Sequence, residues 1–278
     1  MLSVLYTDEE NAFRDEVRAF AERVVAARAQ EIEETAEYPR DLLYELGKAG
    51  YMGALIPKEY GGTGKGMVAE TIIAEEISAV CAMLDVTRGV TSVYFAPPVY
   101  KFGSDEQKKK YLPPIVTGEK IGAIGITEPE VGSDTAGMKT TAVRDGDDFI
   151  INGEKRFITN GSIADYILLF AVTDPSVKAR KGMSAFIFET ETEGFSVVKD
   201  YELMGLRGLK VAHLKFENCR VPASSMMGEE NKGFTILMDE LDTERTSLAA
   251  GAVGYARAAM EIAIEYSTER EQFGQEIR

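Results

Sequence analysis

Residues 122–140 read GAIGITEPEVGSDTAGMKT. The first residues alternate glycine and alanine with isoleucine, as a short buried strand does, and the rest is rich in Gly, Ser and Asp. A loop of this composition after a strand can hold a phosphate through backbone amides and hydroxyl groups. The same residues also turn a chain for purely structural reasons. These residues alone predict a strand followed by a loop, which is either an anion site or a turn.

The periodicity of the chain differs on the two sides of this stretch. Before it, Thr7 and Glu10 form a capping box ahead of apolar residues at helical spacing, Pro39 begins a second helix, and 67–84 predicts a third. After it come short β-rich runs separated by Gly, Asp and Pro. Asn152-Gly153 lies between two of these runs and predicts a hairpin turn. A helical pattern then returns and continues to the end of the chain.

This order predicts an α+β multidomain fold. We expect an N-terminal all-α domain at 1–121 and a middle antiparallel β-barrel-like domain at 122–228. Residues 229–278 are then the first helices of a C-terminal helical bundle domain. No C-cap glycine or polar tail closes the last helix, so we expect this domain to be incomplete and the chain to be C-terminally truncated.

The charge balance excludes several classes of partner. Asp and Glu number 46 against 31 Lys and Arg, a net charge of −15, which is unfavourable for binding nucleic acid or an acidic membrane surface. The N-terminus lacks the pattern of a signal peptide, and no apolar run is long enough to span a bilayer. We therefore expect a cytoplasmic location.

Thiol and imidazole groups are too sparse for several kinds of site. Cys81 and Cys219 are the two cysteines and His213 is the one histidine. A metal site, a disulfide framework and Ser-His-Asp or Cys-His catalysis are therefore not expected. We expect both cysteines to be buried and reduced, and His213 to be solvated on the polar face of a strand. Proton chemistry then falls mainly to carboxylates, Lys or Tyr.

Four motifs in chain order resemble the acyl-CoA dehydrogenase family. They are ITEPEVGSDTAG at 126–137, KRFITNG at 155–161, GLRG at 205–208 and REQFGQ at 270–275. The resemblance implies a flavoprotein that binds FAD and an acyl-CoA, passes electrons to an electron-transfer flavoprotein, and assembles as a homodimer or a homotetramer (a dimer of dimers).

The resemblance also implies a set of FAD contacts. Two residues of the first motif lie against the isoalloxazine ring, and a serine reaches the pyrophosphate and borders the acyl-CoA: Ile126, Thr127 and Ser133. The second motif supplies an aromatic ring on the flavin face and a hydroxyl group near flavin N5, within the run Phe157, Ile158 and Thr159. The last motif reaches the FAD of the dimer partner through Arg270, Gln272 and Phe273. Without the family, the threonines and Phe157 would be ordinary strand and core residues, and Arg270 part of a helical charge pair.

LDTER at 241–245 resembles the pattern in which a subset of the family, including isovaleryl-CoA and long-chain dehydrogenases, carries its catalytic base. Glu244 stands at that position, while Asp242 and Arg245 match residues that line the CoA and substrate channel. Most relatives instead carry the base in a later loop, beyond residue 278. An acidic run near a helix start is also typical of a solvated helix face.

The activity implied is α,β-dehydrogenation of an acyl-CoA thioester to an enoyl-CoA. A carboxylate removes the α-proton, and flavin N5 receives the β-hydride. The alternatives are an oxygen-using or enoyl-reducing relative, or a non-catalytic subunit or fragment of the same fold. The aromatic run at 91–100 suggests an apolar or cyclic acyl group, while Arg88 leaves a dicarboxylic substrate open.

Overall fold

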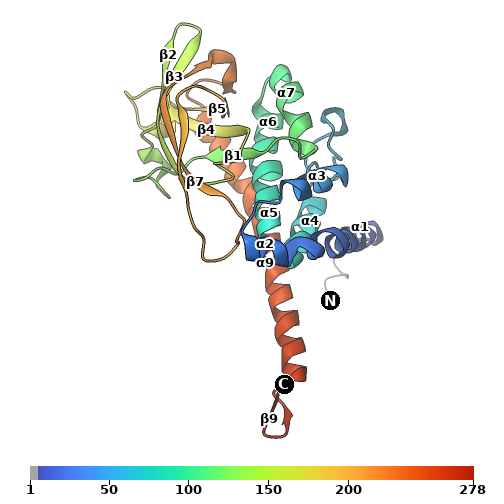
Figure 1. Cartoon of the computed structure of the whole chain (residues 1–278). Helices are drawn as coiled ribbons and strands as arrows, with labels where there is room; N and C mark the ends of the chain where they lie inside the picture. The colour runs from blue at the N-terminus through green and yellow to red at the C-terminus, as the bar shows by residue number, and fades with distance from the viewer. Residues whose placement is uncertain (1–5) are drawn as a thin grey trace.

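The computed structural model describes residues 6–278. Its first part is helical and forms one side of the molecule (Figure 1). The helical elements here are α1 (Asp8–Phe20), the π-helical segment η2 (Ala21–Val25), α2 (Ala26–Thr35), α3 (Arg40–Lys48), the 3-10 turn η3 (Lys58–Tyr60), α4 (Met67–Val80), α5 (Ala82–Gly89), the π-helical segment η4 (Val90–Phe95), α6 (Ala96–Phe102) and α7 (Asp105–Val116).

The capping box predicted at the start of α1 is confirmed. The hydroxyl of Thr7 accepts from the backbone N–H of Glu10 at 3.2 Å, and the Glu10 carboxylate accepts from the backbone N–H of Thr7 at 2.7 Å. The helix that starts at Pro39 is also confirmed, as α3. The segment 61–65, which contains several glycines, forms no helix or strand and connects η3 to α4.

The single helix expected at 67–84 is in fact two helices. Cys81 adopts an extended conformation with φ −149° and ψ 90°, which ends α4 and allows α5 to start in a new direction. No proline or glycine marks this break, and therefore the apolar periodicity runs across it without interruption. This break at Cys81 determines where α5 and η4 lie relative to the site described below.

The middle part is an eight-stranded sheet with strand order β6-β7-β3-β2-β4-β5-β8, in which β1 pairs with β4. Most pairs are antiparallel, and β4 pairs in parallel with β1 and β2. The elements of this part are β1 (Gly122–Gly125), η5 (Thr135–Gly137), β2 (Thr141–Asp145), β3 (Asp148–Thr159), β4 (Tyr166–Val172), α8 (Ala179–Gly182), β5 (Met183–Glu189), β6 (Phe195–Asp200), β7 (Val211–Pro222), η6 (Ala223–Ser225) and β8 (Met226–Met227).

The hairpin turn predicted at Asn152-Gly153 is wrong. Both residues lie inside β3, and the turn to β2 is made at Gly146, where φ is 65°. Gly153 stands at a β-bulge, and a Cβ there would lie 2.5 Å from the hydroxyl of Thr140. The glycine therefore permits a close approach between segments rather than a turn.

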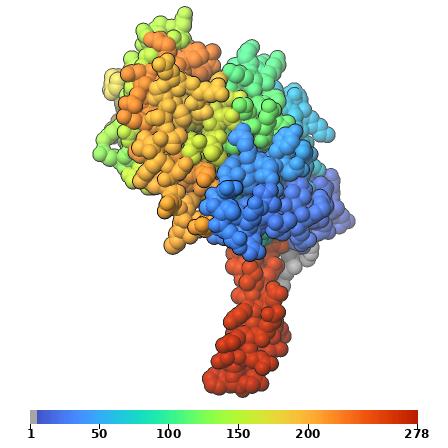
Figure 2. All heavy atoms as spheres, viewed as in Figure 1, coloured from blue at the N-terminus to red at the C-terminus, as the bar shows by residue number. Residues whose placement is uncertain are grey.

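The last part of the chain is dominated by one helix. Helix α9 (Gly233–Glu269) has 37 residues, and the short strands β9 (Glu271–Gln272) and β10 (Gln275–Glu276) follow it. Helix was expected to the end of the chain. Instead Phe273 and Gly274 both have positive φ, 54° and 78°, and make a two-residue hairpin turn. The far half of α9 and this hairpin project beyond the rest of the molecule (Figures 1 and 2).

The first half of α9 packs against α4 and α5. Gly254 and Gly251 permit this close packing, because a Cβ on Gly254 would lie 2.2 Å from the carbonyl oxygen of Glu75. The hydroxyl of Ser78 donates to the carbonyl oxygen of Gly251 at 2.8 Å. The middle of α9, shortly after the LDTER segment, is therefore fixed against the N-terminal helices.

Several smaller expectations also meet the structure. Cys81 and Cys219 are buried free thiols, as predicted. His213 is not solvated, because its Nε2 lies 2.9 Å from a Glu154 carboxylate oxygen across neighbouring strands and its side chain is only 17% exposed. Across residues 6–278, none of the helices has the length and apolar character needed to cross a membrane. The domain boundaries at 121 and 228 stay predictions.

Candidate active site

The first and second motifs lie side by side. The backbone N–H of Arg156 donates to the carbonyl oxygen of Thr127 at 2.8 Å, and Lys155 Nζ donates to the carbonyl oxygen of Ile126 at 3.1 Å. Lys155 also pairs with Glu128 at 2.9 Å. Burial lowers the pKa of Lys155 to about 8, although the carboxylate of Glu128 opposes this shift. A buried ion pair therefore fixes the backbone of the ITEP segment to β3.

Phe157 has the geometry of a platform for a flat ring. It lies at a bulge of β3, its φ is 59°, and 55% of its surface is exposed. A left-handed conformation at a bulky residue costs on the order of 1–3 kcal/mol, and such strain often marks a functional position. Tyr201 packs against the ring with centroids 4.7 Å apart, and the guanidinium of Arg156 lies 4.9 Å from the Phe157 centroid. An aromatic ring is thus held toward solvent beside the ITEP segment.

The next residues of β3 anchor this platform. Ile158 is buried, Thr159 is partly exposed, and Asn160 is fully buried with φ 63°. The Asn160 side-chain amide donates to the carbonyl oxygens of Thr87 at 3.1 Å and Gly122 at 3.2 Å. The end of β3 is thereby tied to both α5 and β1.

The remaining predicted cofactor residues do not gather at this platform. Ser133 is exposed in the loop that follows the ITEP segment. Arg270, Gln272 and Phe273 belong to the hairpin at the far end of α9, away from the sheet of the same chain (Figure 1). The Phe273 side chain is fully exposed.

Glu244 lies on α9 and is partly buried. Burial raises its pKa above the usual range, against the lowering effects of the Glu240 carboxyl and of Arg245. Its neighbours in the motif differ from it, because Asp242 and Arg245 pair with each other at 3.0 Å and have side chains that are 81% and 64% exposed. Within LDTER, the acid at position 244 is therefore the one that faces inward.

Glu240, one helical turn before Glu244, is a residue that the motif analysis missed. It is 1% exposed, and among the described residues no N–H or hydroxyl donor reaches either carboxylate oxygen. Burial, with the negative charge of Glu244, raises its pKa to about 9. The i, i+4 spacing of two acids within an acidic run was the available signal, but spacing alone does not distinguish a buried face from a solvated one.

The aromatic run at 91–100 contributes one residue to this region. Tyr94 in η4 is partly buried, and burial followed by the charges of Glu244 and Glu240 raises its pKa. Phe95 points into the core and is fully buried. Tyr94 is thus the aromatic side chain of this run that lies in the field of the two glutamates.

Arg88 is fully engaged in the interior and is not free to bind a substrate carboxylate. Its guanidinium donates to Glu70 at 2.7 Å and to Asp85 at 2.8 Å, and all three side chains are buried. Ser247 on α9 donates to the same Glu70 carboxylate at 2.9 Å. Because Arg88 is fully paired, its presence in the sequence is no argument for a dicarboxylic substrate.

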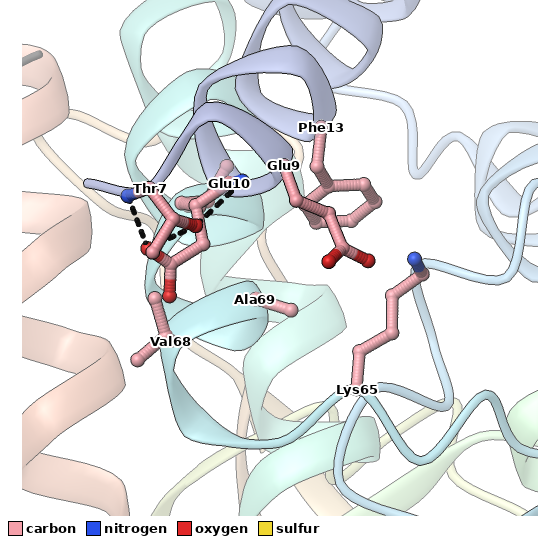
Figure 3. A pocket seen from close by; sticks show the side chains of 8 residues that line it. Thr7, Glu9, Glu10, Phe13, Lys65, Val68 and Ala69 are labelled. Carbon is pink, nitrogen blue, oxygen red and sulfur yellow. Dashed lines mark hydrogen bonds between the residues drawn. The ribbon is translucent and has the colours of Figure 1, made fainter.

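Three cavities lie in the described part of the chain. One of about 500 Å³ lies where β6 leads into β7 and is lined by Tyr201 and part of the GLRG motif. One of about 230 Å³ is lined by Glu128 and Pro129 of the ITEP segment. A third, of about 260 Å³, lies between the start of α1 and α4, where the side chains of Glu9 and Lys65 face one another (Figure 3). The predicted site residues line none of these three cavities, although the first two include neighbours of the motifs.

Comparisons with known families cover nearly the whole chain. Residues 7–119 match the family described as acyl-CoA dehydrogenase, N-terminal domain, 123–219 match the middle domain, and 231–278 match the C-terminal domain. The chain belongs to the acyl-CoA dehydrogenase family. Members of this family are FAD-dependent oxidoreductases, and this chain is therefore an enzyme whose cofactor is FAD.

Individual relatives agree with this assignment. The short-chain specific acyl-CoA dehydrogenase of Clostridium acetobutylicum is 43% identical over 271 residues, which are 98% of this chain and 71% of that protein. The acryloyl-CoA reductase (NADH) of Anaerotignum propionicum is 38% identical over 98% of this chain and 69% of that protein. A solved structure described as the electron transferring flavoprotein of Acidaminococcus fermentans is 41% identical, with a TM-score of 0.94 over 98% of this chain and 71% of that chain.

The residues present in this chain fit a flavin. The solvent-facing ring of Phe157, held in a strained conformation, offers a stacking surface, and the neighbouring ITEP backbone is fixed by the Lys155–Glu128 pair. The fit concerns the isoalloxazine end of FAD. Ser133 and the α9 hairpin stay predicted contacts.

Proposed function

We propose that this chain dehydrogenates an acyl-CoA thioester to an enoyl-CoA, with Glu244 as the base. The observation that supports this proposal is the position of Glu244. It is the acid of the LDTER motif, it is partly buried, and burial raises its pKa, whereas Asp242 and Arg245 are exposed. A carboxylate removed from water is a stronger base than a solvated one.

The reaction needs a strong base because the α-proton of a thioester is only weakly acidic. In the proposed step the Glu244 carboxylate takes the α-proton, and the electron pair of the α-C–H bond becomes the second bond between the α- and β-carbons. FAD, when bound, accepts the β-hydrogen with its electron pair as a hydride. Atoms and electrons balance, with the acyl group oxidised and the flavin reduced by two electrons.

Further residues have proposed binding roles. Ile126, Thr127 and the Phe157–Thr159 run hold the flavin ring, and Ser133 contacts the pyrophosphate and the acyl-CoA. The exposed pair of Asp242 and Arg245 lies on the CoA side of the channel. Tyr94, close to the two glutamates, borders an apolar acyl group, because its ring supplies apolar surface.

The proposed assembly is a homodimer, alone or within a dimer of dimers. The hairpin that holds Arg270, Gln272 and Phe273 lies away from the sheet of its own chain, so a second chain is the natural place for its contacts with FAD. Apolar residues on the projecting half of α9 support this, among them Met260, Ile262, Ile264 and Tyr266. The proposed electron acceptor is an electron-transferring flavoprotein, as the similar structure from Acidaminococcus fermentans suggests.

The test is Glu244→Gln in the FAD-loaded protein, with Glu261→Gln on the exposed face of the same helix as a matched control. Both are mixed with acyl-CoA esters without oxygen, and bleaching of the flavin absorbance is followed. We expect Glu244→Gln to reduce the rate by a factor of about 10³ or more while FAD stays bound, and Glu261→Gln to stay near wild type. A Glu244→Gln rate within a few-fold of wild type would place the base elsewhere.

A second candidate is the opposite direction, reduction of an enoyl-CoA, which the name of the Anaerotignum propionicum relative favours. The same carboxyl group would then supply the α-proton. Comparing flavin reduction by an acyl-CoA with flavin reoxidation by an enoyl-CoA distinguishes the two directions. Oxygen is tested as a further electron acceptor, so that an oxygen-using enzyme is also recognised.

A further inference from the structure

Glu240 is a buried acid that has no role in the proposed reaction, and its surroundings are unfavourable for a charge. A carboxylate that is 1% exposed and receives no hydrogen bond from any N–H or hydroxyl of the described residues is strongly destabilised. The carboxyl group one helical turn away on α9 is that of Glu244, and side chains at i and i+4 are neighbours on a helix. Two carboxylates cannot bond to each other, since neither has a hydrogen to donate. A hydrogen bond between these neighbouring side chains therefore requires a proton on one of them.

We propose that Glu240 is a positioning residue that keeps this proton and donates it in a hydrogen bond to Glu244, which holds the base ionised and oriented. This inference rests on the proposed function of Glu244. Glu240 is the more deeply buried of the two, and the proton resides on the carboxyl group that is harder to solvate.

The charges around the pair agree with this division. On α9 itself, Arg245 favours the ionised form of both acids, while Asp239 disfavours ionisation of Glu240. Asp239 is in turn paired with Lys101 of α6 at 2.7 Å. On η4, burial and then the charges of Glu244 and Glu240 raise the pKa of Tyr94, so it stays a neutral phenol. Arg88 of α5 pairs with Asp85 at 2.8 Å and with Glu70 of α4 at 2.7 Å, so its one positive charge is shared between two acids.

The chemical consequence concerns the working pH of the enzyme. Burial raises the Glu244 pKa, so at a given pH it leaves less of this residue ionised to accept the α-proton. A hydrogen bond donated to its charged form lowers the Glu244 pKa against the effect of burial. Glu240 thereby sets the acid limb of the pH profile without touching the substrate.

The test compares two variants of Glu240 in the FAD-loaded chain. Glu240→Gln keeps an N–H donor, and Glu240→Met keeps the volume but removes the donor. We expect the acid limb of flavin reduction by acyl-CoA to stay in place for Glu240→Gln and to move up by about one to two pH units for Glu240→Met. An unchanged limb in Glu240→Met, or equal shifts in both variants, would overturn the proposal.

A second readout is independent of activity. In protein labelled with ¹³C at the glutamate carboxyl carbon, we expect one glutamate signal to remain protonated at pH 7 and to be missing from Glu240→Gln. Persistence of that signal in Glu240→Gln would assign the proton to another residue and overturn the inference. This measurement decides the question even where Glu240→Met folds poorly.

The outcome for Glu244→Gln separates the two proposals. If Glu244→Gln reduces flavin as fast as the wild type, the function proposed for Glu244 fails. If Glu244→Gln is inactive while Glu240→Met keeps the wild-type pH profile, the role of Glu240 alone fails.

Discussion

Two buried acids at helix α9, Glu76 and Glu240, behave in opposite ways. Glu76 on α4 accepts hydrogen bonds from Arg14 at 2.8 Å, Arg18 at 2.9 Å and Arg257 at 2.9 Å. Burial opposes its ionisation, but these guanidinium groups outweigh that effect and lower its pKa to about 2. Glu240 is buried as deeply and has no cation bonded to it, so burial and the charge of Glu244 raise its pKa to about 9.

The difference shows that burial alone does not decide what an acid does in this protein. With guanidinium groups from α1 and α9, the carboxylate of Glu76 joins three helices and remains charged. With another acid as its neighbour, Glu240 holds a proton that can be shared. Glu76 thus joins helices, whereas the Glu240–Glu244 pair on α9 has the environment that the proposed proton chemistry needs.

The largest expected effect is a pH dependence. Because the folded pKa of Glu240 is raised from 4.5 to about 9, its contribution to stability is present below pH 4.5 and is lost as the pH rises toward 9. Glu240→Gln removes this titration. The free energy of unfolding of Glu240→Gln should therefore gain on the wild type by several kcal/mol between pH 5 and 9, since each pKa unit is worth about 1.4 kcal/mol. Urea unfolding at several pH values measures this, and parallel curves would contradict it.

The next effect concerns Glu76, the acid that is bonded to guanidinium groups. Glu76→Gln leaves the guanidinium groups without a shared charge, and we expect a loss of about 3 kcal/mol in the free energy of unfolding at pH 7. Glu45→Gln is the control, because the Glu45–Lys48 pair is exposed and should cost less than about 1 kcal/mol. The Glu76 contribution to stability should also be lost as the pH falls from 4.5 toward 2. Similar losses in the two variants would remove the contrast between Glu76 and an ordinary surface acid.

A smaller effect tests the packing of α4 against α9 at Gly254. In Gly254→Ala the new methyl group would meet the carbonyl oxygen of Glu75 at 2.2 Å, so the helices must separate. We expect a loss of about 2 kcal/mol in thermal or urea unfolding. Gly89→Ala is the matched control, because its methyl group would meet nothing within 4 Å, and it should be neutral or slightly stabilising. An equally mild Gly254→Ala would mean that the helices yield easily.

The smallest effect is expected for the exposed part of the LDTER segment. Asp242→Asn breaks a solvated pair with Arg245 and should change the free energy of unfolding by less than about 0.5 kcal/mol. If Asp242 lines the CoA channel as proposed, the same variant should weaken binding of a CoA ester, measured by calorimetry. A clear loss in the free energy of unfolding would instead contradict the solvated position of the Asp242–Arg245 pair.

The sequence predicts features whose cause is local. The capping box of Thr7 and Glu10 and the strand before the ITEP segment depend only on neighbouring residues, and the motif order was sufficient to indicate the family. The turn predicted at Gly153 is wrong because this glycine permits the close approach of Thr140, which belongs to another segment. Glu240 was missed for the same kind of reason, since its burial depends on how α9 packs against the N-terminal helices.

Helix α9 has one more consequence, which concerns insertions and deletions. Glu244 and Arg270 are 26 positions apart on one continuous helix and its cap, a span of about 39 Å at 1.5 Å per residue. One added or deleted residue between them would rotate the terminal hairpin by about 100° relative to the glutamate pair. Substitutions at the exposed positions of this interval leave the spacing unchanged, whereas an insertion or deletion alters it. Under the roles proposed for Glu244 and Arg270, the spacing of the two motifs is therefore as much a part of the site as the residues in them.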